Sequence, residues 1–213
     1  MGSFFNYENS LLSKLAKVCD TVTLGVLWAL CSLPIVTMGA ATSALYYAYN
    51  RSIRQELGYA WKTFFEAFKS NFKQATQIWL ILLAMMLLLG LDCYLLHQMA
   101  QDVSLIWVLQ AVIIVSLLFT VLWGLYLFPY LSRFALPNKA VMKNCALIML
   151  ANMPQSLLLL VLLAVAVVSF ICLPVLNLLI PALYILCANP ILEKIFRKYM
   201  RPEDLQTQQE NAT

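Results

Sequence analysis

Few side chains in this sequence could carry chemistry, and they are not grouped as a reaction would require. Asp92 and His97 stand inside a long apolar run, yet they are five residues apart and so do not share a helix face as an i, i+4 pair would. Charged groups within a membrane segment are costly unless solvated or paired. Both residues are close to the end of their run, so we expect head-group water to solvate them. A proton or cation site is the alternative.

The remaining polar groups in apolar runs are amides, and they suit hydrogen bonds between helices better than substrate binding. They are Asn152, Gln155, Asn177 and Asn189. No Ser/His/Asp set, paired carboxylate, phosphate-binding loop or metal-ligand cluster can be assembled from the sequence. The six cysteines are single, with no Cys-x-x-Cys pair, so neither a disulfide framework nor a zinc site is expected. The sequence predicts a protein that is not an enzyme and needs no cofactor.

The positions of the cations indicate the environment of the apolar runs. All fourteen Lys and Arg residues fall into four short stretches, whereas a soluble protein distributes them over its whole surface. Composition agrees, since 62% of residues are hydrophobic and 11% are charged, against roughly 25% charged in a soluble domain. Lys and Arg near span ends are retained on the cytoplasmic side of a membrane. The sequence therefore predicts a multi-pass membrane protein, whose basic stretches face the cytoplasm and contact lipid and not nucleic acid. The four stretches hold Lys14 and Lys17; Arg51, Arg54, Lys62, Lys69 and Lys73; Arg133, Lys139 and Lys143; and Lys194, Arg197, Lys198 and Arg201.

Four later runs are long enough to be membrane segments. Residues 75–98, 105–131 and 145–171 each exceed the roughly 20 residues that cross a bilayer, and 173–190 form a last span bounded by Pro174 and Pro190 and bent at Pro181. The connector 99–104 has no cation and is expected outside, while 132–144 has three and is expected inside. We expect an all-α transmembrane bundle of five to six segments, a single domain over 1–201, and a polar, disordered cytoplasmic tail over 202–213.

The first apolar region, 18–49, contains Leu33 and Pro34 near its middle, and a straight helix through Pro34 is disfavoured. If the region bends but crosses once, the N-terminus lies outside, against the charge rule. If it turns back between Pro34 and Gly39, both termini are cytoplasmic and all cations share one side. We favour this hairpin, with Thr37 as the N-cap of the returning helix.

The returning arm has a small-residue face that includes Gly39, Ala40 and Ala41. Small residues let helix backbones approach closely in lipid. We therefore expect this segment to be an architectural element that packs inside the monomer. A dimer face or a ligand-lined break is the alternative.

Residues 59–74 alternate an aromatic side with a basic side at helical spacing. The pattern predicts an amphipathic helix lying in the cytoplasmic head-group plane with its rings in the acyl boundary. Docking into the groove of a partner is the alternative. The aromatic side comprises Trp61, Phe64, Phe65, Phe68 and Phe72, and the basic side includes Lys62, Lys69 and Lys73.

Two strings carry a family resemblance. The run Leu33-Pro34-Ile35-Val36-Thr37-Met38-Gly39-Ala40-Ala41, and later Phe64-Phe65-Glu66-Ala67-Phe68-Lys69-Ser70-Asn71-Phe72-Lys73-Gln74-Ala75, resemble the signature of the YesL family of small bacterial membrane proteins. Genes of that family commonly accompany carbohydrate-uptake ABC transporters and two-component sensors. The resemblance implies an accessory role in sugar uptake or its sensing, with a transporter permease or a sensor kinase as partner. It supplies no catalytic residue.

Two functions compete on this basis. The leading interpretation is a non-enzymatic accessory membrane protein of a carbohydrate-uptake system. The rival is a small transporter or channel, in which the break at Pro34 to Gly39 and the Pro174 to Pro181 segment form a site near the bilayer midplane. The sequence does not reveal the oligomeric state.

Overall fold

The computed structural model describes residues 2–55, 57–98, 104–134, 136–172 and 180–199, with side chains from residue 15 onward except that of Ser104. The chain in these ranges is all-α and contains no strand, which confirms the predicted fold class. Predictions made for Pro174, Asn177, the 99–103 connector and the 202–213 tail lie outside these ranges.

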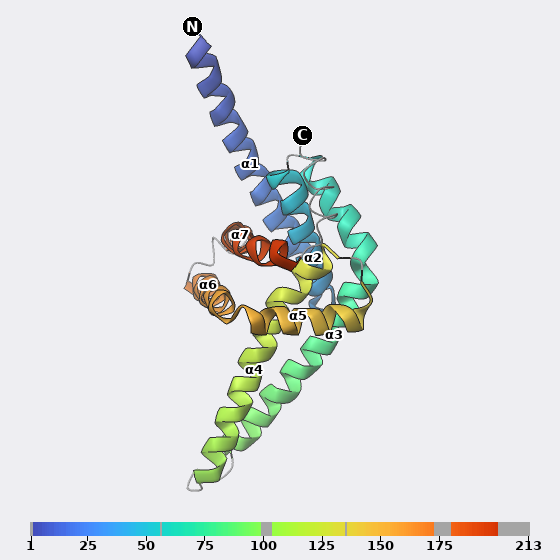
Figure 1. Cartoon of the computed structure of the whole chain (residues 1–213), viewed down its shortest axis with the longest axis vertical. Helices are drawn as coiled ribbons and strands as arrows, with labels where there is room; N and C mark the ends of the chain where they lie inside the picture. The colour runs from blue at the N-terminus through green and yellow to red at the C-terminus, as the bar shows by residue number, and fades with distance from the viewer. Residues whose placement is uncertain (1, 56, 99–103, 135, 173–179, 200–213) are drawn as a thin grey trace.

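Seven α-helices and two short helical turns make up the described ranges (Figure 1). The helices, in chain order, are α1 (Gly2–Ser32), α2 (Met38–Ala48), α3 (Ala60–Gln98), α4 (Ser104–Leu131), α5 (Asn138–Ala151), α6 (Met153–Cys172) and α7 (Ile180–Tyr199). The turns are the 3₁₀ turn η1 (Ile35–Thr37) before α2 and the π-helical turn η2 (Tyr49–Arg54) after it.

The first apolar region is broken where Pro34 predicts. Helix α1 ends at Ser32, η1 follows, and α2 returns alongside α1, with the Trp28 indole donating a hydrogen bond to the Thr42 hydroxyl at 3.1 Å. The hairpin that we favoured is therefore the geometry of this region. Its second arm has 11 residues, which at about 1.5 Å per residue is too short to cross a bilayer.

In the ranges that the structure describes, four helices are long and apolar enough to cross a membrane, where five to six segments were expected. They are α1 from Leu15, α3, α4 from Leu105, and α6. The predicted span 145–171 divides at Asn152, because Pro154 lacks an N–H and suits the first turn of a new helix. Helix α7 is amphipathic and runs through Pro190, where we had ended the last span, because tertiary contacts bury one side of it.

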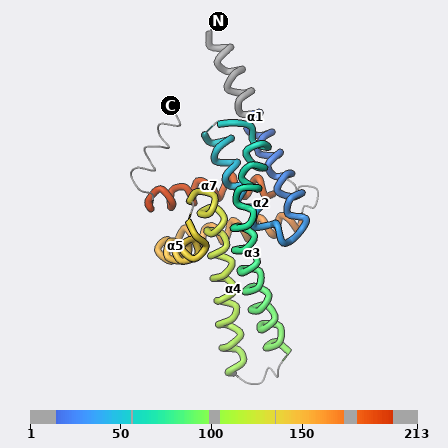
Figure 2. The backbone as a smooth tube through the Cα atoms, turned by 90° about the vertical axis from the view of Figure 1, so that its right-hand side faces the viewer, coloured from blue at the N-terminus to red at the C-terminus, as the bar shows by residue number. Residues whose placement is uncertain are grey.

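Helices α3 and α4 lie side by side and extend beyond the rest of the molecule as a two-helix arm (Figures 1 and 2). From residue 74 to residue 132 the sequence has no Lys or Arg. Large apolar side chains on the arm are exposed, including Leu87, Leu91, Val108 and Val115. Helix α6 is seen end-on in Figure 1 and therefore runs across the direction of the arm. The core lies where α2 packs against α3 and α4, at the base of the arm.

Candidate functional site

The helix break is built around Gly39. A Cβ atom at this position would lie 2.5 Å from Trp79 Cβ, 2.8 Å from Phe128 Cε1 and 3.0 Å from the carbonyl oxygen of Ala75. Only a residue without a side chain fits so close to both α3 and α4. Ala40 and Ala41 are buried beside it. The small-residue face thus packs within the monomer.

Polar groups of the break are satisfied locally. The Thr37 hydroxyl lies 2.6 Å from the carbonyl of Cys31 and 2.8 Å from that of Pro34, and the Trp79 indole donates to the Ile35 carbonyl at 2.6 Å. Thr37 occupies the N-cap position of α2, as predicted, but makes no side-chain cap bond. Its hydroxyl thus reaches the Cys31 carbonyl in the last turn of α1, where carbonyl groups lack a partner within the helix. Leu33 and Pro34 are exposed.

The amphipathic stretch differs from the expectation in its placement. Residues 60–74 and the following apolar run form one continuous helix, α3, without the break that a separate helix in the head-group plane would need. Its buried side includes Phe64, which is fully enclosed by protein. Helix α2 packs against α3, and protein encloses Phe64, one of the rings that we had assigned to lipid, while Trp61, Phe65 and Phe72 are exposed.

The other residues of the stretch lie around that buried stripe. Phe68 is half-buried and forms ring contacts with Phe64 and Phe72, with centroids 6.2 and 5.4 Å apart. The exposed positions include Trp61, Lys62, Phe65, Lys69, Phe72 and Lys73.

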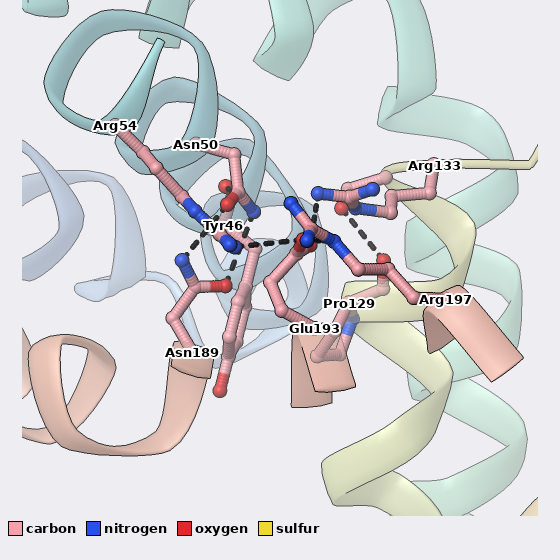
Figure 3. Close-up of polar contacts among 9 residues, drawn as sticks. Tyr46, Asn50, Arg54, Pro129, Arg133, Asn189, Glu193 and Arg197 are labelled. Carbon is pink, nitrogen blue, oxygen red and sulfur yellow. Dashed lines mark hydrogen bonds and ion pairs between the residues drawn. The ribbon is translucent and has the colours of Figure 1, made fainter. Parts of the chain in front are cut away.

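Sequence reasoning missed the buried carboxylate of Glu193. Only 3% of this residue is exposed, and three arginines from different parts of the fold surround it (Figure 3). Arg54 Nη1 lies 2.7 Å from the carboxylate, Arg133 Nη2 pairs with its other oxygen, and Arg197 Nε is 3.9 Å away. Glu193 therefore connects η2, the connector after α4, and α7.

An amide pair adjoins this ion cluster (Figure 3). The Asn189 amide donates to the Asn50 side-chain oxygen at 2.8 Å, and the Asn50 amide reciprocates at 3.2 Å while also reaching the Tyr46 carbonyl at 3.1 Å. Such a reciprocal pair satisfies amide groups that would be costly to bury alone. We call Asn50, Arg54, Arg133, Asn189, Glu193 and Arg197 the polar junction.

Electrostatics in the junction are dominated by burial. Burial lowers the pKa of the Arg133 guanidinium, and the neighbouring Arg54 and Arg197 charges lower it further, whereas Glu193 raises it. One carboxylate thus serves three guanidinium groups. The junction is electropositive, and Glu193 is the group on which its stability depends.

The sequence did contain a signal for Glu193. In α7, buried apolar residues flank it at helical spacing, among them Leu192, Ile195 and Phe196, while the neighbouring Lys194 is exposed. An acid on the apolar stripe of a basic helix needs a cationic partner. The identity of that partner depends on how distant segments pack, which no local pattern reveals.

The other polar residues that the sequence singled out lie in different surroundings. Asn152 donates to the Tyr199 hydroxyl at 3.0 Å and so joins α7 to the end of α5, and Asn189 is in the junction. Gln155, Asp92 and His97 are exposed. Among the residues that the structure describes, no three His, Cys, Asp or Glu side chains lie together as a metal site would need.

Among the cavities that the described residues form, two have a volume of about 520 Å³ each. One is apolar, lies between α3 and α4 on the arm, and is lined by residues such as Leu88 and Phe119. The other lies beside the polar junction, where Arg51 and Arg133 are among its walls. Neither cavity is lined by a residue of the helix break from Leu33 to Ala41.

Comparison with known proteins gives one match. Residues 21–93 are similar to the family described as "Protein of unknown function, DUF624". The matched range runs from α1 through the helix break and most of α3, and it includes both strings on which the resemblance above rests. No curated protein and no solved structure matches the chain. The fold and the match together define a helical membrane protein with a region similar to a family of unknown function.

Proposed function

We propose that the protein is a non-enzymatic accessory protein of the bacterial cytoplasmic membrane. It acts through contacts made by the cationic side chains at the base of the α3–α4 arm. The observation that carries this proposal is the polar junction. It ties η2, the α4–α5 connector and α7 together at the base of the α3–α4 arm, through a carboxylate that is 3% exposed. Such a buried network suits a rigid platform that presents a fixed surface to another protein.

The exposed cations on α3 are the surface that we assign to the partner. Lys62, Lys69 and Lys73 are all exposed and share a helix that is anchored along α2. Charged groups on a rigid helix favour a complementary acidic surface and raise the rate of association. Both termini are cytoplasmic in this proposal, which places every Lys and Arg on one side.

The identity of the partner rests on the resemblance to the YesL family, with which the DUF624 match is compatible. We assign the partner to a carbohydrate-uptake ABC transporter, through its permease, or to the sensor kinase that controls it. The lipid bilayer is the second partner, contacted by the exposed apolar arm.

Affinity capture of the tagged protein in mild detergent tests the proposal. We expect permease subunits or a sensor kinase among the captured proteins, and a Lys62→Gln, Lys69→Gln, Lys73→Gln variant should lose most of them. A matched control carries Lys139→Gln and Lys143→Gln on α5, which remove exposed charges elsewhere.

Two outcomes would contradict the accessory role. The first is equal recovery from both variants, which would remove the assigned surface. The second is sugar flux into vesicles that contain this protein alone, which would make it a transporter in its own right.

A further inference from the structure

Two segments that are distant in the sequence line the cavity beside the polar junction. Tyr47, Asn50, Arg51 and Gln55 line one side, from α2 and η2, and Ser132 and Arg133 line the other, from the end of α4. π-Helical turns are rare and often occur at functional sites. Here the turn directs Asn50 and Arg54 to the junction while Arg51 lines the cavity.

Arg133 is an unsatisfied donor at this cavity. Its side chain is 10% exposed, and its Nη2 group pairs with Glu193. Its Nη1 group is buried and has no hydrogen-bond partner among the described residues. A buried donor without an acceptor is costly, and more so when it is charged. An oxygen of a ligand bound in this cavity would give that donor an acceptor.

Charge at the cavity points to the kind of oxygen. Among the described residues, Glu193 is the carboxylate paired with Arg54, Arg133 and Arg197, and Arg51 adds a further cation whose Nη1 donates to the Tyr47 hydroxyl at 2.7 Å. The cationic residues Arg51 and Arg133 both line the cavity. Two cationic groups in one cavity favour an anion over a neutral ligand.

We propose that this cavity binds a phosphate group, held by Arg51 and Arg133 with Gln55 as a neutral donor. Guanidinium groups match phosphate oxygens in a bidentate geometry, which makes arginine suited to this ligand. The volume of about 520 Å³ admits a phosphate that carries an organic substituent. The group can thus belong to free phosphate or to the head group of an anionic phospholipid at the cytoplasmic membrane surface.

The first arm of the test uses inorganic phosphate. Calorimetric titration of the delipidated protein in neutral detergent, at constant ionic strength with chloride, measures binding of free phosphate. The second arm measures retention of phosphatidylglycerol, relative to phosphatidylcholine, by native mass spectrometry after both lipids are supplied in equal amounts. Saturable phosphate binding indicates the free ligand, and selective retention of phosphatidylglycerol indicates the head group. Either supports the site.

Substitutions distinguish specific phosphate binding in the cavity from attraction by the overall positive charge of the surface. Arg51→Gln should weaken binding about tenfold or more, as expected for loss of a charged hydrogen bond, and Gln55→Ala should weaken it by a smaller factor. Arg133→Gln should abolish it, although this variant also breaks a buried ion pair. Arg197→Gln is the matched control, because it removes the same charge from the junction but does not line the cavity; it should change binding less than threefold.

Three results would overturn the proposal. They are no phosphate binding together with no lipid preference, unchanged binding in a folded Arg51→Gln protein, and equal losses in Arg51→Gln and Arg197→Gln. The last would reduce the effect to the overall positive charge of this end of the molecule.

Discussion

At the scale of single residues, Glu193 has the greatest influence on the fold. It neutralises part of a cationic cluster whose nearest members are Arg54 and the mostly buried Arg133. Removing one partner of a buried ion pair is far more costly than replacing the whole pair, because an uncompensated charge remains. The same reasoning makes Arg197, which is exposed and 3.9 Å away, a minor contributor.

We therefore expect Glu193→Gln to destabilise the protein by about 3 kcal/mol. Adding Arg133→Met to that variant should recover part of the loss, since it removes the stranded charge. Thermal unfolding in detergent, followed by the fluorescence of a thiol dye or by aggregation, measures both. Arg197→Gln is the control and should stay close to the parent. A Glu193→Gln protein as stable as the parent would mean that water already solvates the arginines.

Gly39 makes a second prediction at this scale. Because even a Cβ atom there would come within 2.5 Å of Trp79 Cβ, Gly39→Ala should cost about 1–3 kcal/mol by forcing α2 from α3. Gly39→Leu should lower the amount of folded protein in the membrane. Gly90→Ala on the same α3 is the control, since nothing lies within 4 Å of a Cβ at that position. Equal thermal stability of the Gly39 and Gly90 alanine variants would contradict the close packing described for the break.

The third prediction at the scale of single residues concerns Thr37. Thr37→Val removes the hydroxyl that reaches the Cys31 and Pro34 carbonyls, which should cost about 1 kcal/mol, whereas Thr37→Ser keeps the hydroxyl and should lose less. Thermal unfolding of the two variants side by side measures the difference. A valine variant as stable as the parent would mean that the hydroxyl contributes nothing to the stability of the break.

At the scale of elements, local patterns predicted the helices better than their junctions. The break at Pro34 follows from the stereochemistry of proline, and α4 occupies nearly the range expected from its apolar run. Pro154 is a local signal for the division of the helix at Asn152. The apolar character of the run 145–171 nevertheless led us to predict one unbroken span. No local sequence signal predicted the continuity of α3. An amphipathic segment followed by an apolar one has the same pattern whether or not the helix bends between them. Packing on α2 decides that question.

A distance measurement tests that continuity. Spin labels at the exposed positions Glu66 and Leu87, introduced as cysteines in a cysteine-free background, should be about 32 Å apart along one straight helix. If residues 60–74 instead lay in the head-group plane at right angles to the crossing segment, the separation would fall to about 22 Å. Pulsed electron spin resonance in lipid nanodiscs distinguishes these values. Labels at Leu87 and Val108, within the arm, control for its integrity.

At the scale of the whole molecule, the sequence predicted the class but not the site. Membrane class and the confinement of cations follow from composition and charge placement, which are properties of the chain alone. The polar junction joins Asn50 to Asn189 and Arg54 to Glu193 across 139 residues of sequence in each case. Such pairs arise from how helices stack. The place of Glu193 on the apolar stripe of α7 indicates a cationic partner, but it does not identify Arg54 as that partner.

The last prediction concerns how the molecule sits in the membrane. The arm of α3 and α4 has exposed apolar side chains and no Lys or Arg between residues 74 and 132, whereas Arg133 and Lys73 mark its base. Since cations near span ends stay in the cytoplasm, the arm should cross with the α3–α4 connector outside and both termini inside. A reporter enzyme that works only outside should be active when fused after Gln101, and silent at residue 3 and after Pro137. A fluorescent protein that matures only in the cytoplasm, fused at the same three sites, should give the reciprocal pattern and so exclude poor expression as the cause of silence. Activity at residue 3 would place the N-terminus outside, which requires α1 to cross on its own and places Lys14 and Lys17 against the charge rule.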